Sequence, residues 1–104
     1  MKKLRISDDA SAYLRAERAY LARFDKRAAS AMILQLRQAM EMLRRFPLAG
    51  RALKVPRGVR RFSAPPYVID YEVADGILSV LVVRHARQHD PEIAPDTDDD
   101  FEDI

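Results

Sequence analysis

The chain has 104 residues, 48% of them hydrophobic, which predicts one small globular domain. No apolar run approaches the roughly 20 residues that span a bilayer. The acidic Asp8 and Asp9 come too early for the apolar core of a secretion signal. Cysteine is absent, which excludes disulfides and thiolate metal sites, and we expect a cytoplasmic protein.

Charge is divided unevenly along the chain. Residues 90–104 hold eight of the 16 acids and no lysine or arginine. The 18 basic residues therefore lie in residues 1–89 beside only eight acids, which gives that part a net charge of +10. Such a charge attracts phosphates or an acidic protein partner. We expect a folded domain over residues 1–89 and an acidic tail over residues 90–104, predicted to be disordered in isolation.

The beginning of the chain predicts a short strand followed by a helix. Residues 3–6 alternate polar and apolar side chains, as a strand does. A serine or aspartate at positions 7–9 supplies the side-chain oxygen that caps the next helix, expected to run to about Phe24. Glu17 interrupts the apolar stripe of this helix, and we expect it to pair with a neighbouring arginine. The stripe has helical spacing and consists of Ala10, Leu14, Leu21 and Phe24.

A second helix is predicted from its cap at Asp25 to the residues before Pro47. A short turn separates it from the first helix, so the two should form an antiparallel hairpin. Its apolar stripe is continuous and is expected to be buried. The members are Ala29, Met32, Ile33, Leu36, Ala39, Met40 and Leu43.

The rest of the chain predicts a basic loop and three strands. The loop is expected over residues 51–58, and a short strand over residues 59–63. Residues 67–73 alternate cleanly, and an Asp-Gly turn at 75–76 connects them to the apolar central strand 77–83. The order β-α-α-β-β-β predicts an α+β fold, with a helical hairpin packed on a mostly antiparallel sheet.

Four motifs occur in order through this region. They are Phe46-Pro47-Leu48-Ala49-Gly50-Arg51, Val59-Arg60-Arg61-Phe62, the alternating Tyr67, Ile69, Tyr71 and Val73, and the last strand followed by Arg84-His85-Ala86-Arg87. Over residues 3–89 the chain thereby resembles the RelE/ParE superfamily, the toxins of bacterial type II toxin–antitoxin pairs. Three positions depart from the usual pattern: Val68 stands where arginine is frequent, Asp70 where an apolar residue is common, and Glu17 where an aliphatic residue is preferred. The acidic tail is not a general feature of the family either.

The resemblance implies one of two activities. RelE-like toxins are ribosome-dependent endoribonucleases that cut messenger RNA, whereas ParE-like toxins act on DNA gyrase. Members of both branches are silenced by an antitoxin whose C-terminal segment wraps the toxin. A third alternative is a degenerate, non-toxic member that only binds its antitoxin.

Messenger RNA cleavage by 2′-hydroxyl attack needs a base, an acid and cations that stabilise the phosphorane. If this chain were such an enzyme, the candidates would be His85, Arg84, Arg61 and Lys54. RelE-like enzymes often carry a catalytic tyrosine after the last strand, but Ala86 follows His85 here. Tyr67 and Tyr71 alternate with apolar residues and are expected in the core. We therefore favour the ParE-like branch, with no catalytic residue and DNA gyrase as the target.

Two sets of binding residues follow from this interpretation. The basic loop and strand ends should form one target-binding surface from Lys54, Arg57, Arg60, Arg61, Arg84, His85 and Arg87. Apolar residues of the hairpin are candidates for contact with a ParD-like antitoxin in a hetero-oligomer: Leu14, Tyr20, Leu21, Met32 and Leu36. Operator DNA would be bound only through that antitoxin.

No cofactor or metal is expected. His85 and His89 are four residues apart, but they follow a strand and lack a third ligand of defined spacing. The acidic tail has three open roles: an inert solubilising segment, which is the commonest case, a segment that folds back on the basic surface, or an aid in holding the antitoxin.

Overall fold

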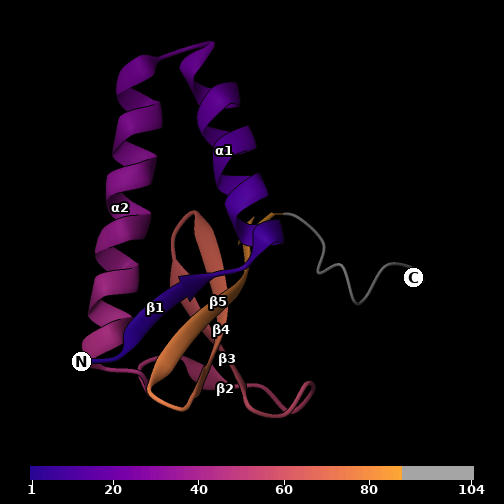
Figure 1. Ribbon diagram of the computed structural model, residues 1–104. Helices are drawn as coiled ribbons and strands as arrows, with labels where there is room; N and C mark the ends of the chain where they lie inside the picture. Colours follow the sequence, from indigo (N-terminus) through magenta and orange to yellow (C-terminus); the bar gives the residue numbers. More distant parts are fainter. Residues whose placement is uncertain (88–104) are drawn as a thin grey trace, which may run out of the picture.

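The computed structural model describes residues 1–87; the predicted domain boundary at residue 89 and the acidic tail lie outside the described residues. Within this part, the elements follow in the order β1 (Lys3–Ile6), α1 (Asp8–Ala22), α2 (Lys26–Arg45), β2 (Arg51–Ala52), β3 (Val59–Ala64), β4 (Tyr67–Ala74) and β5 (Ile77–His85). The sheet has the order β1-β5-β4-β3-β2, with β1 parallel to β5 and the other pairs antiparallel. Figure 1 shows the helical hairpin rising from one side of this sheet, which confirms the predicted α+β class.

The strand β2 was not predicted from the sequence, which indicated an irregular loop from Arg51. It forms because Arg51 pairs with Arg61 and Ala52 pairs with Arg60 on β3. Two exposed residues are too few to show a strand alternation, so the partner strand defines this element.

Both predicted helix caps are present. The side chain of Ser7 accepts a hydrogen bond from the amide of Ala10 at 3.0 Å, and that of Asp25 accepts one from the amide of Arg27 at 2.9 Å. The caps fix where each arm of the hairpin begins.

Neither described helix combines the length and hydropathy that crossing a membrane requires.

Phe24 was predicted to complete the buried stripe of the first helix, and this prediction is wrong. The helix α1 ends at Ala22, and the chain turns toward α2 before Phe24 can reach the core. Its ring is 71% exposed and packs edge-on against Tyr20, with 5.2 Å between the ring centroids.

The core lies between the hairpin and one face of the sheet. The helix α2 contributes the buried Met32, Leu36, Met40 and Leu43, as its stripe predicted. The sheet contributes side chains of β4 and β5 that lie on its helix-facing side: Tyr67, Ile69, Tyr71, Leu78, Val80 and Val83. Burying these apolar surfaces is the main driving force for folding.

A β-bulge in β5 decides which of its side chains face the helices. Asp70 pairs with Val82, whereas its neighbour Tyr71 pairs with Val80, so Leu81 is an extra residue. The helix-facing positions are therefore Val80 and then, after the bulge, Val83 and His85. Without the bulge, alternation would have continued through Val82 and Arg84.

The helix–strand junction at residues 46–51 is organised by Tyr71. Its hydroxyl donates to the carbonyl of Pro47 at 2.6 Å and accepts from the amide of Gly50 at 2.9 Å. A Cβ atom at position 50 would lie only 2.7 Å from that hydroxyl. Glycine is required here because the ring of Tyr71 occupies the space of a side chain.

Candidate target-binding surface

The sheet face opposite the helices, here called the outer face, displays arginines from four strands. The registers place Arg5, Arg51, Arg61 and Arg84 on this face, from β1, β2, β3 and β5 respectively. The strand β4 contributes the acids Asp70 and Glu72 to the same face, near its middle. The outer face is thus basic at its borders, with a carboxylate pair in its centre.

Asp70 forms an ion pair with Arg61 across neighbouring strands. The guanidinium donates to the carboxylate twice, from Nε at 2.7 Å and from a terminal nitrogen at 2.9 Å. Both side chains are largely shielded from solvent, with 19% of Arg61 and 12% of Asp70 exposed. Two-point binding of this kind fixes the orientation of the guanidinium. Much of the Arg61 charge is therefore balanced within the protein.

The predicted target-binding residues do not form one surface. Arg61 and Arg84 share the outer face, whereas Arg60 and His85 occupy positions on the helix-facing side. Adjacent residues of a strand point to opposite faces, so strand alternation separates Arg60 from Arg61. The predicted strand 59–63 already implied this separation, and grouping the two arginines on one surface was wrong.

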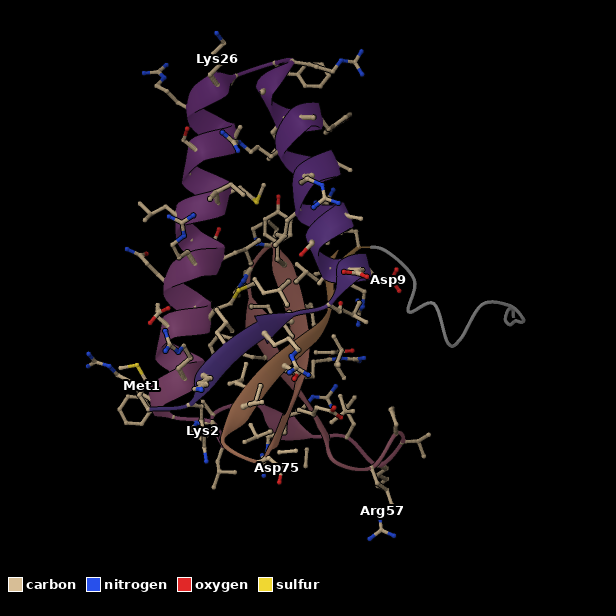
Figure 2. The ribbon with its side chains drawn as sticks, in the orientation of Figure 1. Met1, Lys2, Asp9, Lys26, Arg57 and Asp75 are labelled. Atoms are coloured by element: carbon tan, nitrogen blue, oxygen red, sulfur yellow. The ribbon has the colours of Figure 1, made fainter. Side chains whose placement is uncertain are left out.

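Arg60 holds the helix–strand junction. It donates to the carbonyl of Gly50 at 2.7 Å, on the same junction that Tyr71 organises. The loop between β2 and β3 carries Lys54 and Arg57 in exposed positions, and Figure 2 shows Arg57 pointing away from the body of the molecule. Arg87 is exposed beyond the end of β5.

A polar cluster, here called the tyrosine cluster, lies between α1 and the ends of β4 and β5. The Tyr67 hydroxyl donates to Glu17 at 2.7 Å, and the His85 ring packs edge-on against Tyr67, 5.6 Å between centroids. The predicted arginine partner of Glu17 is wrong, since its carboxylate bonds Tyr67. The sequence signal for this contact was the position of Glu17 within the apolar stripe of the helix, where a carboxylate needs a polar partner such as Tyr67.

The electrostatics of the tyrosine cluster favour neutral phenols. Burial raises the pKa of Tyr13 to about 12, and the neighbouring charge of Glu17 adds to this shift. Burial also raises the pKa of Tyr67, helped by its hydrogen bond to Glu17. Both phenols therefore stay protonated at neutral pH, and the Tyr67 hydroxyl donates a hydrogen bond to Glu17 rather than acting as a base.

The hairpin residues predicted to contact an antitoxin are mostly buried. Met32 and Leu36 are only 4% and 1% exposed, and Leu14 and Leu21 are half-buried against the same core. Tyr20 is 54% exposed and offers a ring to a partner. Of the predicted set, Tyr20 is therefore the residue most accessible on this surface.

The residues that the structure describes contain no group of three or more histidine, aspartate and glutamate side chains arranged to hold a metal ion. His89, one of the two histidines considered as a metal ligand, lies outside them.

The described part of the chain thus has a helical hairpin on one face of a β1-β5-β4-β3-β2 sheet and arginines on the other face. Residues 4–90 match the family described as "ParE toxin of type II toxin-antitoxin system, parDE". The chain belongs to this family and is a toxin of the ParE/RelE superfamily.

Individual relatives agree with the family. The chain is 40% identical to the toxin RelE2 of Caulobacter vibrioides over 79 residues, which cover 76% of this chain and 89% of that protein. In a structure of the chromosomal ParDE toxin–antitoxin system from P. aeruginosa, one chain is similar with a TM-score of 0.69 at 22% identity, over 82% of this chain and 96% of that one. A chain of the RelBE2 toxin–antitoxin complex from Mycobacterium tuberculosis gives 0.59 at 20% identity, over 81% and 96%. The two structural likenesses support the fold.

Proposed function

We propose that this toxin acts by binding DNA gyrase through its outer face, without proton transfer, and that a ParD-like antitoxin neutralises it in a hetero-oligomer. The family match to the ParE toxin supports the gyrase target. The toxin acts in the cytoplasm, and it meets operator DNA only through its antitoxin.

The arrangement of titratable residues carries this proposal. No histidine or tyrosine lies on the outer face of the described strands, because Tyr67, Tyr71 and His85 all occupy helix-facing positions. The outer face offers arginines and two carboxylates, of which Asp70 is held by Arg61 and Glu72 is exposed to solvent. Messenger RNA cleavage would need an acid and a base beside those cations. Docking on a protein or a protein–DNA complex needs only these cations and a surface whose shape complements that of the target.

The proposal is tested by a gyrase supercoiling assay with the purified chain. We expect the wild type to inhibit supercoiling, and the double variant Arg5→Gln, Arg84→Gln to inhibit less strongly. Hydrogen bonds to charged groups are worth about 1.5–3 kcal/mol each, so the loss should be at least roughly tenfold. The matched control is Arg27→Gln, Arg45→Gln, which removes the same charge from exposed positions on α2.

Inhibition that is absent in the wild type, or equal in both double variants, would contradict the proposal. Circular dichroism of each variant separates a lost contact from a lost fold.

Because a relative is named RelE2, a parallel assay should follow messenger RNA on translating ribosomes. Cleaved message that disappears in His85→Ala would favour the ribonuclease alternative.

Toxicity itself is tested in cells. Expression without an antitoxin should arrest growth, and co-expression with the antitoxin should restore it. Normal growth under the first condition would indicate the third alternative, a degenerate module that only binds its partner.

A further inference from the structure

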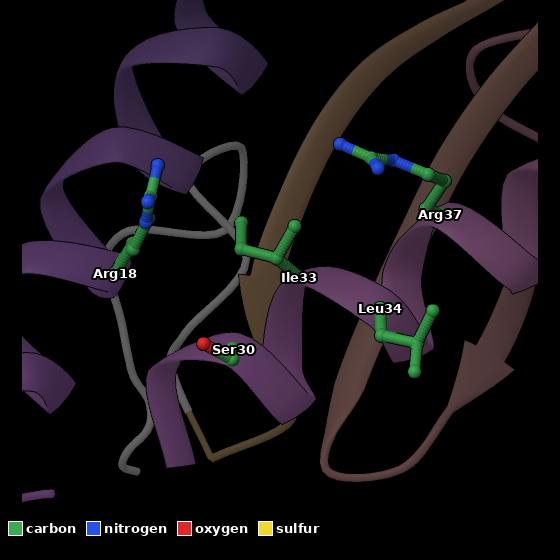
Figure 3. Close-up of a pocket in the computed structure, with 5 residues that line it drawn as sticks. All are labelled: Arg18, Ser30, Ile33, Leu34 and Arg37. Carbon is green, nitrogen blue, oxygen red and sulfur yellow. The ribbon is translucent and has the colours of Figure 1, made fainter. Parts of the chain in front are cut away.

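A groove of about 240 Å³ lies between the two helices, away from the outer face. Arg18 of α1 borders it, and α2 contributes Ser30, Ile33, Leu34 and Arg37. Figure 3 shows Ile33 between the two arginines. Leu34 is 55% exposed although it is a large apolar residue. The groove therefore combines an apolar floor with a cation on each side.

The two arginines of the groove are not neutralised within the described part of the chain. The guanidinium groups of Arg18 and Arg37 make no ion pair or hydrogen bond with another described residue, whereas that of Arg44, also on α2, is paired with Glu41 at 2.9 Å. An apolar strip between two uncompensated cations favours a ligand that is both acidic and apolar.

The last residues of this chain have that composition. Residues 98–104 read Asp-Asp-Asp-Phe-Glu-Asp-Ile, with five acids around two large apolar side chains. The two large apolar residues are Phe101 and Ile104. The segment offers anions for Arg18 and Arg37, and apolar groups for Ile33 and Leu34.

We propose that residues 98–104 dock into the hairpin groove of their own chain. The described structure ends at Arg87, and 13 residues separate it from Phe101. Extended chain covers up to about 3.3 Å per residue, roughly 43 Å here. The longest dimension of the described part of the chain is 41 Å, so the groove is within reach. Because the contact is intramolecular, the effective concentration is on the order of millimolar, and a weak intrinsic affinity is enough for docking.

This docking is independent of the identity of the toxin's target. It is a property of this chain's own sequence, since it needs both the groove arginines and the terminal acidic, apolar segment. A docked segment covers the apolar floor and removes two uncompensated cations from the surface of the hairpin.

The test uses the full chain and its lack of native cysteine. Asp103→Cys gives a unique site for a nitroxide label, and paramagnetic broadening of backbone amide signals reports which surface the tail visits. We expect selective signal loss at Ser30, Ile33, Leu34 and Arg37, at a concentration low enough to suppress contacts between molecules. Reduction of the label supplies the diamagnetic reference.

The control variants separate a specific site from general attraction. The double variant Arg18→Glu, Arg37→Glu should restore the broadened signals. The double variant Phe101→Ala, Ile104→Ala should restore them too, and it changes no residue of the described domain. Arg27→Glu, Arg45→Glu changes the charge of the hairpin equally and should leave the broadening in place.

Three outcomes would overturn the proposal. The first is broadening centred on outer-face amides such as Arg61 and Arg84, which would place the tail on the target-binding surface. The second is broadening that is weak and uniform over the molecule. The third is groove broadening that fades on dilution, which would mean contact with a second copy.

Discussion

Gly50 is required by one close contact, that of its backbone with the side chain of Tyr71. The Tyr71 ring and hydroxyl lie where a side chain at position 50 would begin, because a Cβ atom added there would be 2.8 Å from the ring and 2.7 Å from the hydroxyl. The backbone carbonyl of Arg61 would be 3.0 Å from the same atom. Neither the strand backbone nor a fully buried tyrosine has room to move, because protein interiors are close-packed.

We expect Gly50→Ala to lower the free energy of unfolding by about 1–3 kcal/mol, the usual cost of overpacking a core. Urea denaturation followed by circular dichroism measures this change. The cost should be smaller in a Tyr71→Phe background, where the nearest contact atom is gone. An equal cost in both backgrounds would show that Tyr71 does not impose the glycine.

The tyrosine cluster predicts how stability depends on pH. The ordinary tyrosine pKa is 10.0, and the pKa values of Tyr13 and Tyr67 are raised in the folded chain. Above pH 10 the unfolded chain therefore binds fewer protons than the folded chain, so the free energy of unfolding falls as pH rises. Below pH 10 both states keep these protons, and the cluster adds no pH dependence.

Tyr67→Phe should flatten the decline in stability above pH 10, measured by urea denaturation at a series of alkaline pH values. Tyr20→Phe is the matched control, because it removes an exposed phenol that lies on α1 outside the cluster. A decline of unchanged steepness in Tyr67→Phe would contradict the assignment of this effect to the cluster.

At the scale of elements, Ser7 connects the start of α1 to the bulge of β5. Its side chain caps the helix at the amide of Ala10, and its hydroxyl donates to the carbonyl of the bulge residue Leu81 at 2.8 Å. One residue thus fixes where the helix begins and supports the change of alternation in the strand.

Ser7→Ala should lower the free energy of unfolding by about 1–2 kcal/mol, the usual cost of losing a helix cap. Ser7→Asp keeps an acceptor for the cap but cannot donate to Leu81 when ionised, so it should recover only part of that stability. Ser7→Thr keeps both functions and is the control. Denaturant titration distinguishes the three; full recovery in Ser7→Asp would show that the bond to Leu81 contributes nothing.

At the scale of the whole molecule, charge segregation remains the main electrostatic feature. The first 89 residues carry 18 bases and eight acids, and the tail carries the other eight acids. Opposite charges on one chain reduce its attraction to an external polyanion, and this effect is strongest at low salt.

Replacing Asp98, Asp99 and Asp100 with asparagine should therefore delay elution of the full chain from a heparin column to higher salt. The charge-conserving control replaces the same residues with glutamate and should elute with the wild type. Equal elution of the asparagine variant and the wild type would mean that the tail does not offset the basic part.

Much of the architecture was available from local sequence patterns. The caps at Ser7 and Asp25, the apolar stripe of α2 and the alternation around Tyr71 each follow from interactions between residues close in the chain. These patterns predicted both helices and four of the five strands. They also supported the family resemblance, because its motifs lie on the same elements.

The sides of the sheet were decided only by tertiary structure. The bulge at Leu81 places His85 on the helix-facing side and Arg84 on the outer face; it arises in the pairing of β5 with β4, and Ser7 donates a hydrogen bond to the carbonyl of Leu81. The Arg61–Asp70 pair likewise joins neighbouring strands. The sequence determined which charges are present, whereas packing between distant segments determined which of them a partner can reach, because a strand's two faces differ only once it has neighbours.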